Sequence, residues 1–469
     1  MILPLGVQTT PRARWRLGFR GFFGRAGNSV LIAIFGLLSG CATYSDRIAE
    51  VRAHADRGAY AAALNEINGV LGVGSVEDLP GSWKGDRPLA ALERAVLLQA
   101  TGEYGLSARD MSGAETELEL LDLKTDTVGQ IGKYVYSDSA RAYEASPTER
   151  LSLNALNLTN FLVLGDLSKS AVEARRFTNM RDYLASIGLD AQGTFGSYVA
   201  GFTFEKLGEG DRALRYYEEA LEGGKLNSLT APVARLARAN PYRGPRIEAL
   251  LVSSATQPAG DHEGSPSEIL TIFALGRVPY KVPKRIPIGA AVGLAGTWIT
   301  GNTAILERSF LKVVVYPELQ NSGTRAKTAT LKIDGSPVPV ELVSNLGSDI
   351  RKEYELIKPR ILGAALTRMI ARAAVAEGAR ASGREAGGGA GAVIGLLAAL
   401  AAEGSLVVLD KPDTRSWTFL PERVFIARTS VAPGEHRVDV VIPGVAETRS
   451  VAVRVPEGGF VVVVVTVPR

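Results

Sequence analysis

The stretch from Gly201 to Leu221 reads GFTFEKLGEGDRALRYYEEAL and sets the pattern for the first half of the chain. Small and aromatic residues recur in it at fixed distances: 3, 12, 16 and 19 positions after Gly201 stand Phe204, Ala213, Tyr217 and Ala220. Small side chains at such positions let two antiparallel helices approach closely, while aromatic neighbours fill the space between helical pairs. The stretch therefore predicts a pair of packed helices.

These distances are those of the tetratricopeptide repeat, which the stretch resembles. Three weaker copies are RGAYAAALNEINGVL, TGEYGLSARDMSGAE and LVLGDLSKSAVEARRF, with small residues at Ala63, Ala108 and Ala171. From residue 44 to about 240 the sequence reads as one helix after another, with short breaks at Gly and Pro. A plain helical bundle is the alternative, because alanine-rich helices occur in any α-protein. The recurring pattern favours a repeat array.

A stacked array of helical repeats presents a concave surface that normally binds a protein or a peptide. We therefore expect partner contacts at the aromatic repeat positions Tyr60, Tyr104, Phe204 and Tyr217. This expectation comes from architecture and not from a recognised site.

Beyond Asn240 the composition changes, and the hydrophobic period shifts towards strands. The sequence predicts an α+β multidomain protein: a helical repeat domain over 41–240, a Pro/Gly-rich linker over 241–268, and a mixed, mainly antiparallel β domain with inserted Ala/Gly-rich helices over 269–469. Strands are expected at 269–275, 310–316, 329–333, 338–343, 406–409, 424–429, 436–442, 450–455 and 460–467, and a helix, kinked or reopened at Pro359, over 349–377. The last four strands, joined by short links, predict an antiparallel meander in a sandwich, with FVVVVVTV inside it.

Two segments combine alanine with regularly spaced glycine. Ala386 to Ala402 carries glycines at 387, 391 and 395, and Ile286 to Gly296 carries them at 289 and 293. Such spacing promotes helix pairing in membranes, so membrane insertion or an oligomeric contact is one interpretation. A buried helix pressed onto a sheet is the interpretation that we favour, because 17 residues lie at the short limit for spanning a bilayer.

The single cysteine, Cys41, follows a segment with the layout of a secretory signal. Residues 1–40 hold five arginines and no acid, then the apolar run Val30 to Leu38 and two small residues. Removing them lowers the 53 basic residues to 48, against 49 acidic ones, so the basic balance of the whole chain gives no reason to expect nucleic acid. The sequence LLSGCA resembles the lipobox of bacterial lipoproteins, which implies cleavage before Cys41 and its acylation. In lipoproteins of this kind, an Asp after the cysteine commonly marks retention in the inner membrane. Ala42 and Thr43 follow Cys41 here, so the same resemblance implies the outer membrane.

Several stretches resemble one known group of proteins. DTRSWTFLP, APGEHRVDVVI and LGDLSKSAVEARR are similar to an uncharacterised family of proteobacterial lipoproteins that pair tetratricopeptide-like repeats with a C-terminal β domain. PGEHRVDVVIPG is also similar to the β-hairpin of PEGA-type envelope modules. Members of the lipoprotein family tend to be encoded beside activators of penicillin-binding proteins, which implies a role near cell-wall synthesis.

Motifs for catalysis are missing from the sequence. His54, His262 and His436 lie far apart without ligand spacing, and there is no Gly-x-Ser-x-Gly, no HExxH and no P-loop lysine. We expect no enzymatic activity, no metal and no cofactor.

Asp413, Arg415 and Trp417 form the cluster that most resembles a binding site. They could contact a sugar or a peptide, with Trp417 stacking on the ligand. The favoured alternative is that Arg415 pairs with Asp413 while Trp417 packs between strand and helix. The sequence thus predicts a scaffold or adaptor lipid-anchored at the periplasmic face of the outer membrane, which binds an envelope protein. The alternative is a lipoprotein that binds glycan or peptidoglycan through its β domain.

Overall fold

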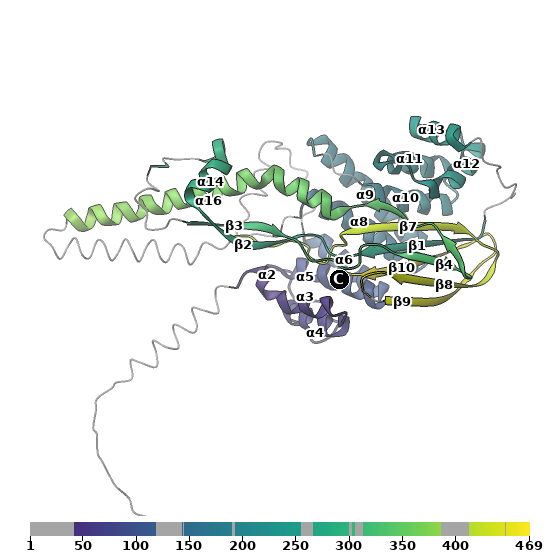
Figure 1. Cartoon of the computed structure of the whole chain (residues 1–469), viewed down its shortest axis with the longest axis horizontal. Helices are drawn as coiled ribbons and strands as arrows, with labels where there is room; N and C mark the ends of the chain where they lie inside the picture. Colours follow the sequence, from purple (N-terminus) through teal and green to yellow (C-terminus); the bar gives the residue numbers. More distant parts are fainter. Residues whose placement is uncertain are drawn as a thin grey trace, which may run out of the picture. The chain divides into compact units, whose positions relative to one another are not determined.

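The computed structural model describes residues 42–118, 143, 145–189, 193–254, 266–299, 303–304, 313–385, 412–445 and 447–469. Helices occupy the N-terminal half and strands the C-terminal part, which confirms the mixed α+β class (Figure 1). Cys41 and the predicted segments 386–402 and 406–409 lie outside the described residues.

The described residues of the first half form a series of α-helices. They are α2 (Tyr44–Arg47), α3 (Ala49–Asp56), α4 (Tyr60–Leu71), α5 (Arg87–Thr101), α6 (Tyr104–Glu117), α8 (Pro147–Val163), α9 (Leu167–Ser186), α10 (Thr194–Lys206), α11 (Gly210–Ala220), α12 (Thr230–Ala239) and α13 (Pro245–Ser254). Helix α13 falls within the predicted linker 241–268 and packs against α11 and α12, so helical structure extends beyond residue 240.

Consecutive helices pack as hairpins with one recurring turn. In the pairs α3–α4, α5–α6, α8–α9 and α10–α11, the turn contains a glycine at positive φ, namely Gly58, Gly102, Gly165 and Gly208, with φ of 75°, 86°, 72° and 78°. The next residue's N–H donates to the carbonyl five residues back, for example from Glu103 to Leu98 at 2.8 Å and from Glu209 to Phe204 at 2.9 Å. Glycine tolerates this left-handed conformation, and the bond satisfies a carbonyl at the helix end.

The α10–α11 hairpin comes from the stretch with the clearest repeat pattern. A Cβ atom at Gly201 would lie 2.6 Å from the ring of Tyr217, so only glycine lets the two helices approach this closely. Phe204 and Tyr217 are fully buried. The close-packed hairpin is thus as predicted, whereas its assignment to the tetratricopeptide class stays a prediction.

Strands form three sheets in the described part of the chain. The strands are β1 (Glu268–Leu275), β2 (Tyr280–Pro287), β3 (Val313–Gln320), β4 (Thr330–Ile333), β5 (Ser336–Val338), β6 (Glu341–Ser344), β7 (Arg423–Ser430), β8 (Gly434–Ile442), β9 (Glu447–Val455) and β10 (Phe460–Val467). Their order is β10-β1-β7-β6 in the first sheet, β2-β3 in the second and β5-β4-β8-β9 in the third.

The predicted meander of the last four strands is wrong. Strands β8 and β9 do form an antiparallel hairpin, but β7 pairs antiparallel with β1, and β10 pairs parallel with β1. The connections from β7 to β8 and from β9 to β10 therefore lead from one sheet to another. The reason is that β7 and β10 both pair with the apolar strand β1, which lies far away in sequence.

Other strand boundaries also differ from expectation. The expected strand at 338–343 is two strands, β5 and β6, in different sheets, and Pro339 stands between them. The expected strand at 310–316 is observed as β3, shifted toward the C-terminus, and β2 was not predicted. The hairpin at Gly335 is confirmed by the pairing of β4 with β5.

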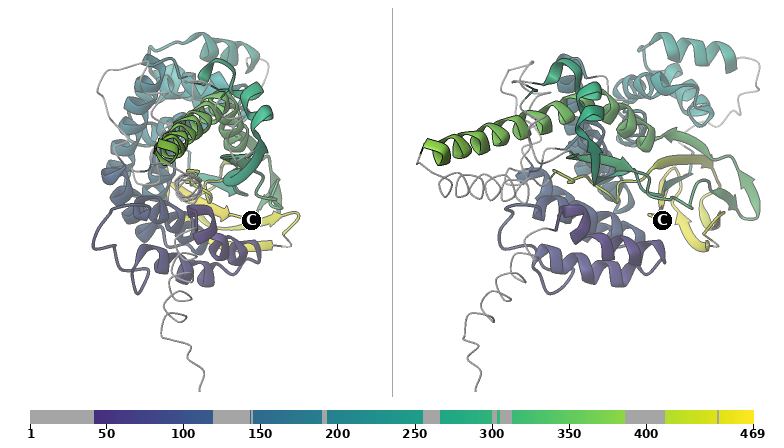
Figure 2. Two further views of the ribbon diagram at one scale, coloured as in Figure 1. Left: turned by 90° about the vertical axis from the view of Figure 1, so that its left-hand side faces the viewer. Right: turned by 60° about the vertical axis from the view of Figure 1, so that its left-hand side comes forward.

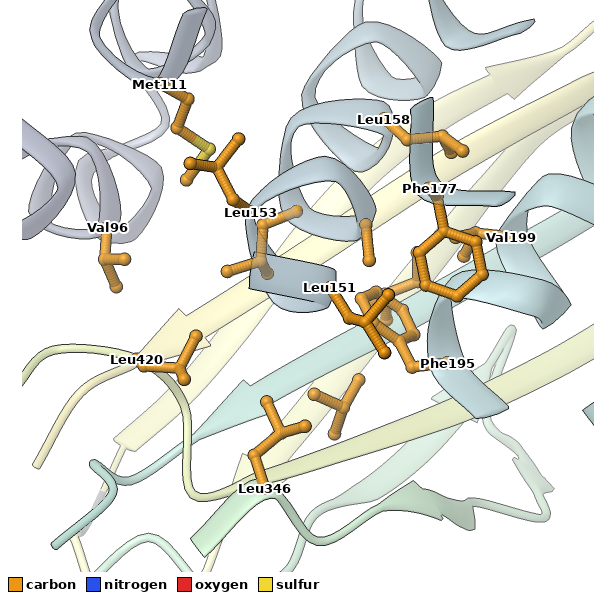
Figure 3. Close-up of a cluster of buried hydrophobic side chains, with 14 of the residues drawn as sticks. Val96, Met111, Leu151, Leu153, Leu158, Phe177, Phe195, Val199, Leu346 and Leu420 are labelled. Carbon is orange, nitrogen blue, oxygen red and sulfur yellow. The ribbon is translucent and has the colours of Figure 1, made fainter. Parts of the chain in front are cut away.

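The first sheet lies between the helices and the third sheet. Alternate residues of its strands point to opposite sides: Leu270, Ile272, Val424, Ile426, Val462 and Val464 join the helical core, and Ile269, Phe273, Leu275, Phe425, Val465 and Val467 join the core shared with the third sheet. Figure 3 shows the helical side, where Leu346 and Leu420 face Leu151 and Phe195. FVVVVVTV is thus covered on both faces, as predicted.

A third apolar core holds together the remaining elements, which we call the arm: β2, α14 (Ile288–Ala295), the 3₁₀-helix η3 (Gly296–Trp298), β3 and α16 (Leu346–Glu385) (Figure 1, Figure 2). Helix α16 is longer than the predicted 349–377 and continues through Pro359. No second helix opens there, because contacts with β3 and α14 hold α16 on both sides of the proline: Tyr354 donates to the Pro317 carbonyl at 2.7 Å, and Leu362 is fully buried.

Candidate functional site

The helices that face the first sheet are covered by the chain itself. Helices α5 and α8 contact β10, and α10 contacts β6. Every residue is buried over Pro88–Ala100 of α5, Thr148–Asn160 of α8 and Thr194–Glu205 of α10. A partner therefore has no access to this face in the structure.

The predicted partner-binding residues accordingly contact their own chain. Tyr104, on α6, donates its hydroxyl to the Val464 carbonyl of β10 at 3.0 Å, and Phe204 stacks on Tyr216 with ring centroids 5.3 Å apart. Tyr217 donates its hydroxyl to Glu205 at 2.6 Å, and Tyr60 is half-buried against the helical core. Phe204 and Tyr217, without exposed surface, serve packing.

The segment Pro412–Leu420 contacts β2 of the arm, where the Lys281 N–H donates to Ser416 Oγ at 3.3 Å, and it packs into the helical core through Trp417, Phe419 and Leu420. We call it the bridging segment. Its amide groups need acceptors because the segment forms neither helix nor strand. Two buried carboxylates supply them: Glu149 accepts from the Trp417 N–H at 2.7 Å, and Glu93 accepts from the Thr418 and Phe419 N–H groups at 2.8 and 2.7 Å. Helices α8 and α5 thus hold the segment by side chains from two hairpins.

Burial raises the pKa of Glu93 to about 8, although the hydrogen bonds from Phe419 and Thr418 act in the opposite direction. The charge of Glu149 nearby raises it further. Glu149 also accepts from the Tyr143 hydroxyl at 2.6 Å and from the Ser146 N–H at 2.7 Å, in a capping box that begins α8. These carboxylates are occupied by donors of their own chain, so the pair serves to position the bridging segment.

The structure brings Asp413 and Arg415 together within the bridging segment. Arg415 donates from Nε and Nη2 to the two carboxylate oxygens of Asp413, each at 2.8 Å. Burial alone would raise the pKa of Asp413, but the guanidinium of Arg415 holds it below its usual value. Trp417 is fully buried. The observed arrangement is the packing alternative, since the Trp417 ring has no surface on which a sugar could stack.

A buried ion cluster joins α10 to the first sheet. Arg428 on β7 donates to Glu205 at 2.6 Å, to Glu268 on β1 at 2.7 Å and to the Tyr217 hydroxyl at 3.0 Å. Burial raises the pKa of Glu205, but Arg428, Lys206 and Arg235 together outweigh this and lower it to about 2. Sequence reasoning missed this cluster because Glu205 and Arg428 are 223 positions apart. It is a structural connection, with every charge paired.

The described histidines, His54 and His436, lie apart and each contacts a single side chain. His436 faces Asp334 at 2.6 Å and His54 faces Arg57 at 3.1 Å, while His262 lies outside the described residues. No group of three His, Cys, Asp or Glu side chains in the described part could hold a metal ion. A hollow between α8, α9, α10 and Leu346 has a volume of about 10 Å3, which is room for no more than about one water molecule.

The arm exposes an apolar surface at α14. Ala291 and Ala295 pack onto the core with α16, with exposed fractions of 0% and 1%, whereas Leu294 and Trp298 are 53% and 46% exposed. The favoured interpretation of 286–296 as a helix buried against a sheet therefore holds for one face only. That face of α14 is buried against α16 and the sheet of β2 and β3, and the other face is exposed.

Within the described part, no helix combines the length and the apolar character that crossing a membrane requires. A scan against family models, a search of curated proteins and a search of solved structures found no match to the chain. The resemblance to a lipoprotein family, the acylation of Cys41 and the envelope location therefore stay predictions.

Proposed function

We propose that this protein is a lipid-anchored scaffold or adaptor at the periplasmic face of the bacterial outer membrane, where its helical half binds a protein partner in cell-wall synthesis or envelope assembly. Acylated Cys41 supplies the anchor, and the protein carries no reaction of its own.

The observation that supports the anchor best is the start of the compact unit, which runs from Thr43 to Arg469. Thr43 caps α2 in a reciprocal arrangement with Asp46, its N–H donating to the carboxylate at 2.8 Å. Two residues span at most about 7 Å. An acylated Cys41 would therefore hold the folded body directly against the bilayer, with almost no linker.

The covered helical face leaves the hairpin turns and outer helices as the surface for a partner. Leu164 and Leu207, which precede two of the turn glycines, are 52% and 38% exposed, and Val172 on α9 is 42% exposed. Large apolar side chains near hairpin turns contribute little to the core. They are suited to contacts with another protein, and this moves the expected docking surface away from the inner helices.

Site-specific photo-crosslinking in cells tests this proposal. A photoreactive residue at Val172 or Leu207 should capture an envelope protein, and the same residue at Val451, which is 44% exposed on β9 and outside the helical half, serves as the matched control. Capture should fall when Cys41→Ala releases the protein from the membrane. No adduct from either outer site would contradict the adaptor role. Mass spectrometry tests the anchor independently: an unmodified Cys41 thiol or a start at Met1 would overturn it.

A further inference from the structure

Helix α14 turns a glycine-containing face away from the other elements of the arm. A Cβ atom at Gly289 or Gly293 would meet nothing within 4 Å, so these glycines do not serve a close helix contact with the described residues. Together with Leu294 and Trp298 they form a surface, which we call the tip, that is apolar and exposed. Water-exposed apolar patches of this kind usually mark an interaction surface.

Three cations lie in or beside the elements that form the tip. Lys284 and Arg285 are exposed at the end of β2, and the guanidinium of Arg360 on α16 lies over the Trp298 ring, 4.0 Å from its centroid. No acidic residue occurs from position 284 to 299. The tip thus combines an apolar surface, an aromatic ring and a rim of positive charge, which is the combination that interfacial membrane contacts use.

We propose that the tip inserts into the interfacial region of a bilayer that contains anionic lipids. The eight residues of α14 extend about 12 Å, too short to span a bilayer, so the helix would lie in the plane of the headgroups. Leu294 and Trp298 enter the acyl boundary, and Lys284 and Arg285 contact lipid phosphates. A symmetric contact between two copies fits less well, because it would bring the cations of both tips together.

The arm places the tip within reach of the same bilayer as the lipid anchor. Helix α2, which begins directly after Thr43, contacts β2, and the Arg52 guanidinium lies 4.3 Å from the centroid of the Tyr280 ring at the start of β2. The eight residues of β2 then run about 26 Å to α14. Of the proposed function, this inference uses only the membrane location. The tip would be a second attachment point that fixes the orientation of the body.

Vesicle co-sedimentation tests the tip without the anchor. Residues 43–469, the compact unit, should bind vesicles of phosphatidylglycerol and phosphatidylethanolamine, and should bind phosphatidylcholine vesicles much less. The double variant Leu294→Ser/Trp298→Ser should bind at least about tenfold more weakly than the parent. The double variant Lys284→Glu/Arg285→Glu should abolish the preference for anionic lipid. Val252→Ser, at an apolar residue of α13 that is 77% exposed, should bind as the parent does.

Three outcomes would overturn the inference: no binding of the parent to anionic vesicles, equal binding of parent and tip variant, or a tip-dependent dimer in analytical ultracentrifugation. Circular dichroism serves to check that each variant is folded. We expect all of them to fold, because the substituted positions are exposed. Acylation of Cys41 is read separately by mass spectrometry, so failure of the tip and failure of the anchor are distinguished.

Discussion

The buried carboxylates of Glu93 and Glu149 accept hydrogen bonds from backbone N–H groups, as the carbonyl groups of a neighbouring strand do in a sheet. They accept three consecutive amide groups of the bridging segment, Trp417, Thr418 and Phe419. Because an unpaired buried N–H costs about 1–3 kcal/mol, these two side chains determine where the segment can lie. Asp413 and Arg415 add a local pair that keeps the same segment extended before it enters the helical layer.

The raised pKa of Glu93 makes stability depend on pH. Burial lifts it from 4.5 to about 8, so the folded state binds a proton more tightly than the unfolded state does. The contribution of Glu93 to stability is fully present below pH 4.5 and is lost as the pH rises to about 8. We expect the free energy of unfolding to fall across this window by a few kcal/mol. Glu93→Gln, which has no titratable proton, should reduce the slope, as measured by urea unfolding at pH 5, 6, 7 and 8. A smaller slope should remain, because burial also raises the pKa of Glu173 and of Glu353 to about 7.

Two controls separate this effect from others. Glu66→Gln, at an exposed position of α4, should leave the slope unchanged. The pKa of Glu205 is lowered to about 2, so its contribution is lost only as the pH falls below about 4.5, outside the window. A slope between pH 5 and 8 that is the same in Glu93→Gln and in the parent would show that Glu93 does not titrate there.

Local signals in the sequence identified single positions but not their distant partners. The pair of Asp413 and Arg415 is visible because two positions separate them, and Cys41 stands out because it is the only cysteine. Glu93 and Glu149 carry no such signal: their partners lie 325 and 268 positions away. Both acids sit in helices that are buried all round, where the periodicity of the sequence identifies no exposed polar face.

At the scale of elements, helices were predictable and strand partners were not. Small and aromatic spacing predicted the hairpin of Gly201 and Tyr217 correctly, because both helices and their turn lie in one short stretch. Strand β10 was recognised as a strand, yet its partner β1 is almost 200 positions earlier. An apolar run that is buried on both faces fits any central or covered position, so the sequence alone does not choose its neighbour.

The contact between Gly201 and Tyr217 leads to a test at this scale. Gly201→Ala places a Cβ atom 2.6 Å from the Tyr217 ring, which must push α10 and α11 apart or displace the ring. We expect a loss of about 1–3 kcal/mol in the free energy of unfolding, as is typical of overpacked cores. Gly289→Ala on α14 is the matched control, since nothing lies within 4 Å of its Cβ position.

The control should be neutral or should gain about 0.5–1 kcal/mol from helix propensity. Thermal and urea unfolding of both variants measure the difference. Equal stability of Gly201→Ala and Gly289→Ala would mean that the two helices are not held at the observed distance.

For the whole molecule, the largest apolar core belongs to both halves of the chain. Leu97 and Phe195 of the helices pack in the same cluster as Ile272, Ile426 and Val464 of the first sheet. Composition suggested two domains joined by a linker, and residues 255–265 lie outside the described residues. The described residues on either side nevertheless form one compact unit from Thr43 to Arg469. The helical layer thus needs the sheet, and the sheet needs the helical layer.

This mutual dependence predicts the behaviour of the separated halves. Residues 43–254 alone would expose the inner faces of α5, α8 and α10, which are buried throughout in the intact chain. Because each fully buried Leu, Val or Phe side chain contributes about 1.5–3 kcal/mol, we expect this fragment to aggregate or to lack a cooperative unfolding transition. Residues 266–469 alone should behave in the same way, and co-expression of both fragments should recover a soluble complex with one transition. Cooperative unfolding of residues 43–254 by themselves, with the helical circular dichroism of the intact protein, would instead identify an independent repeat domain whose inner face is free to bind a partner.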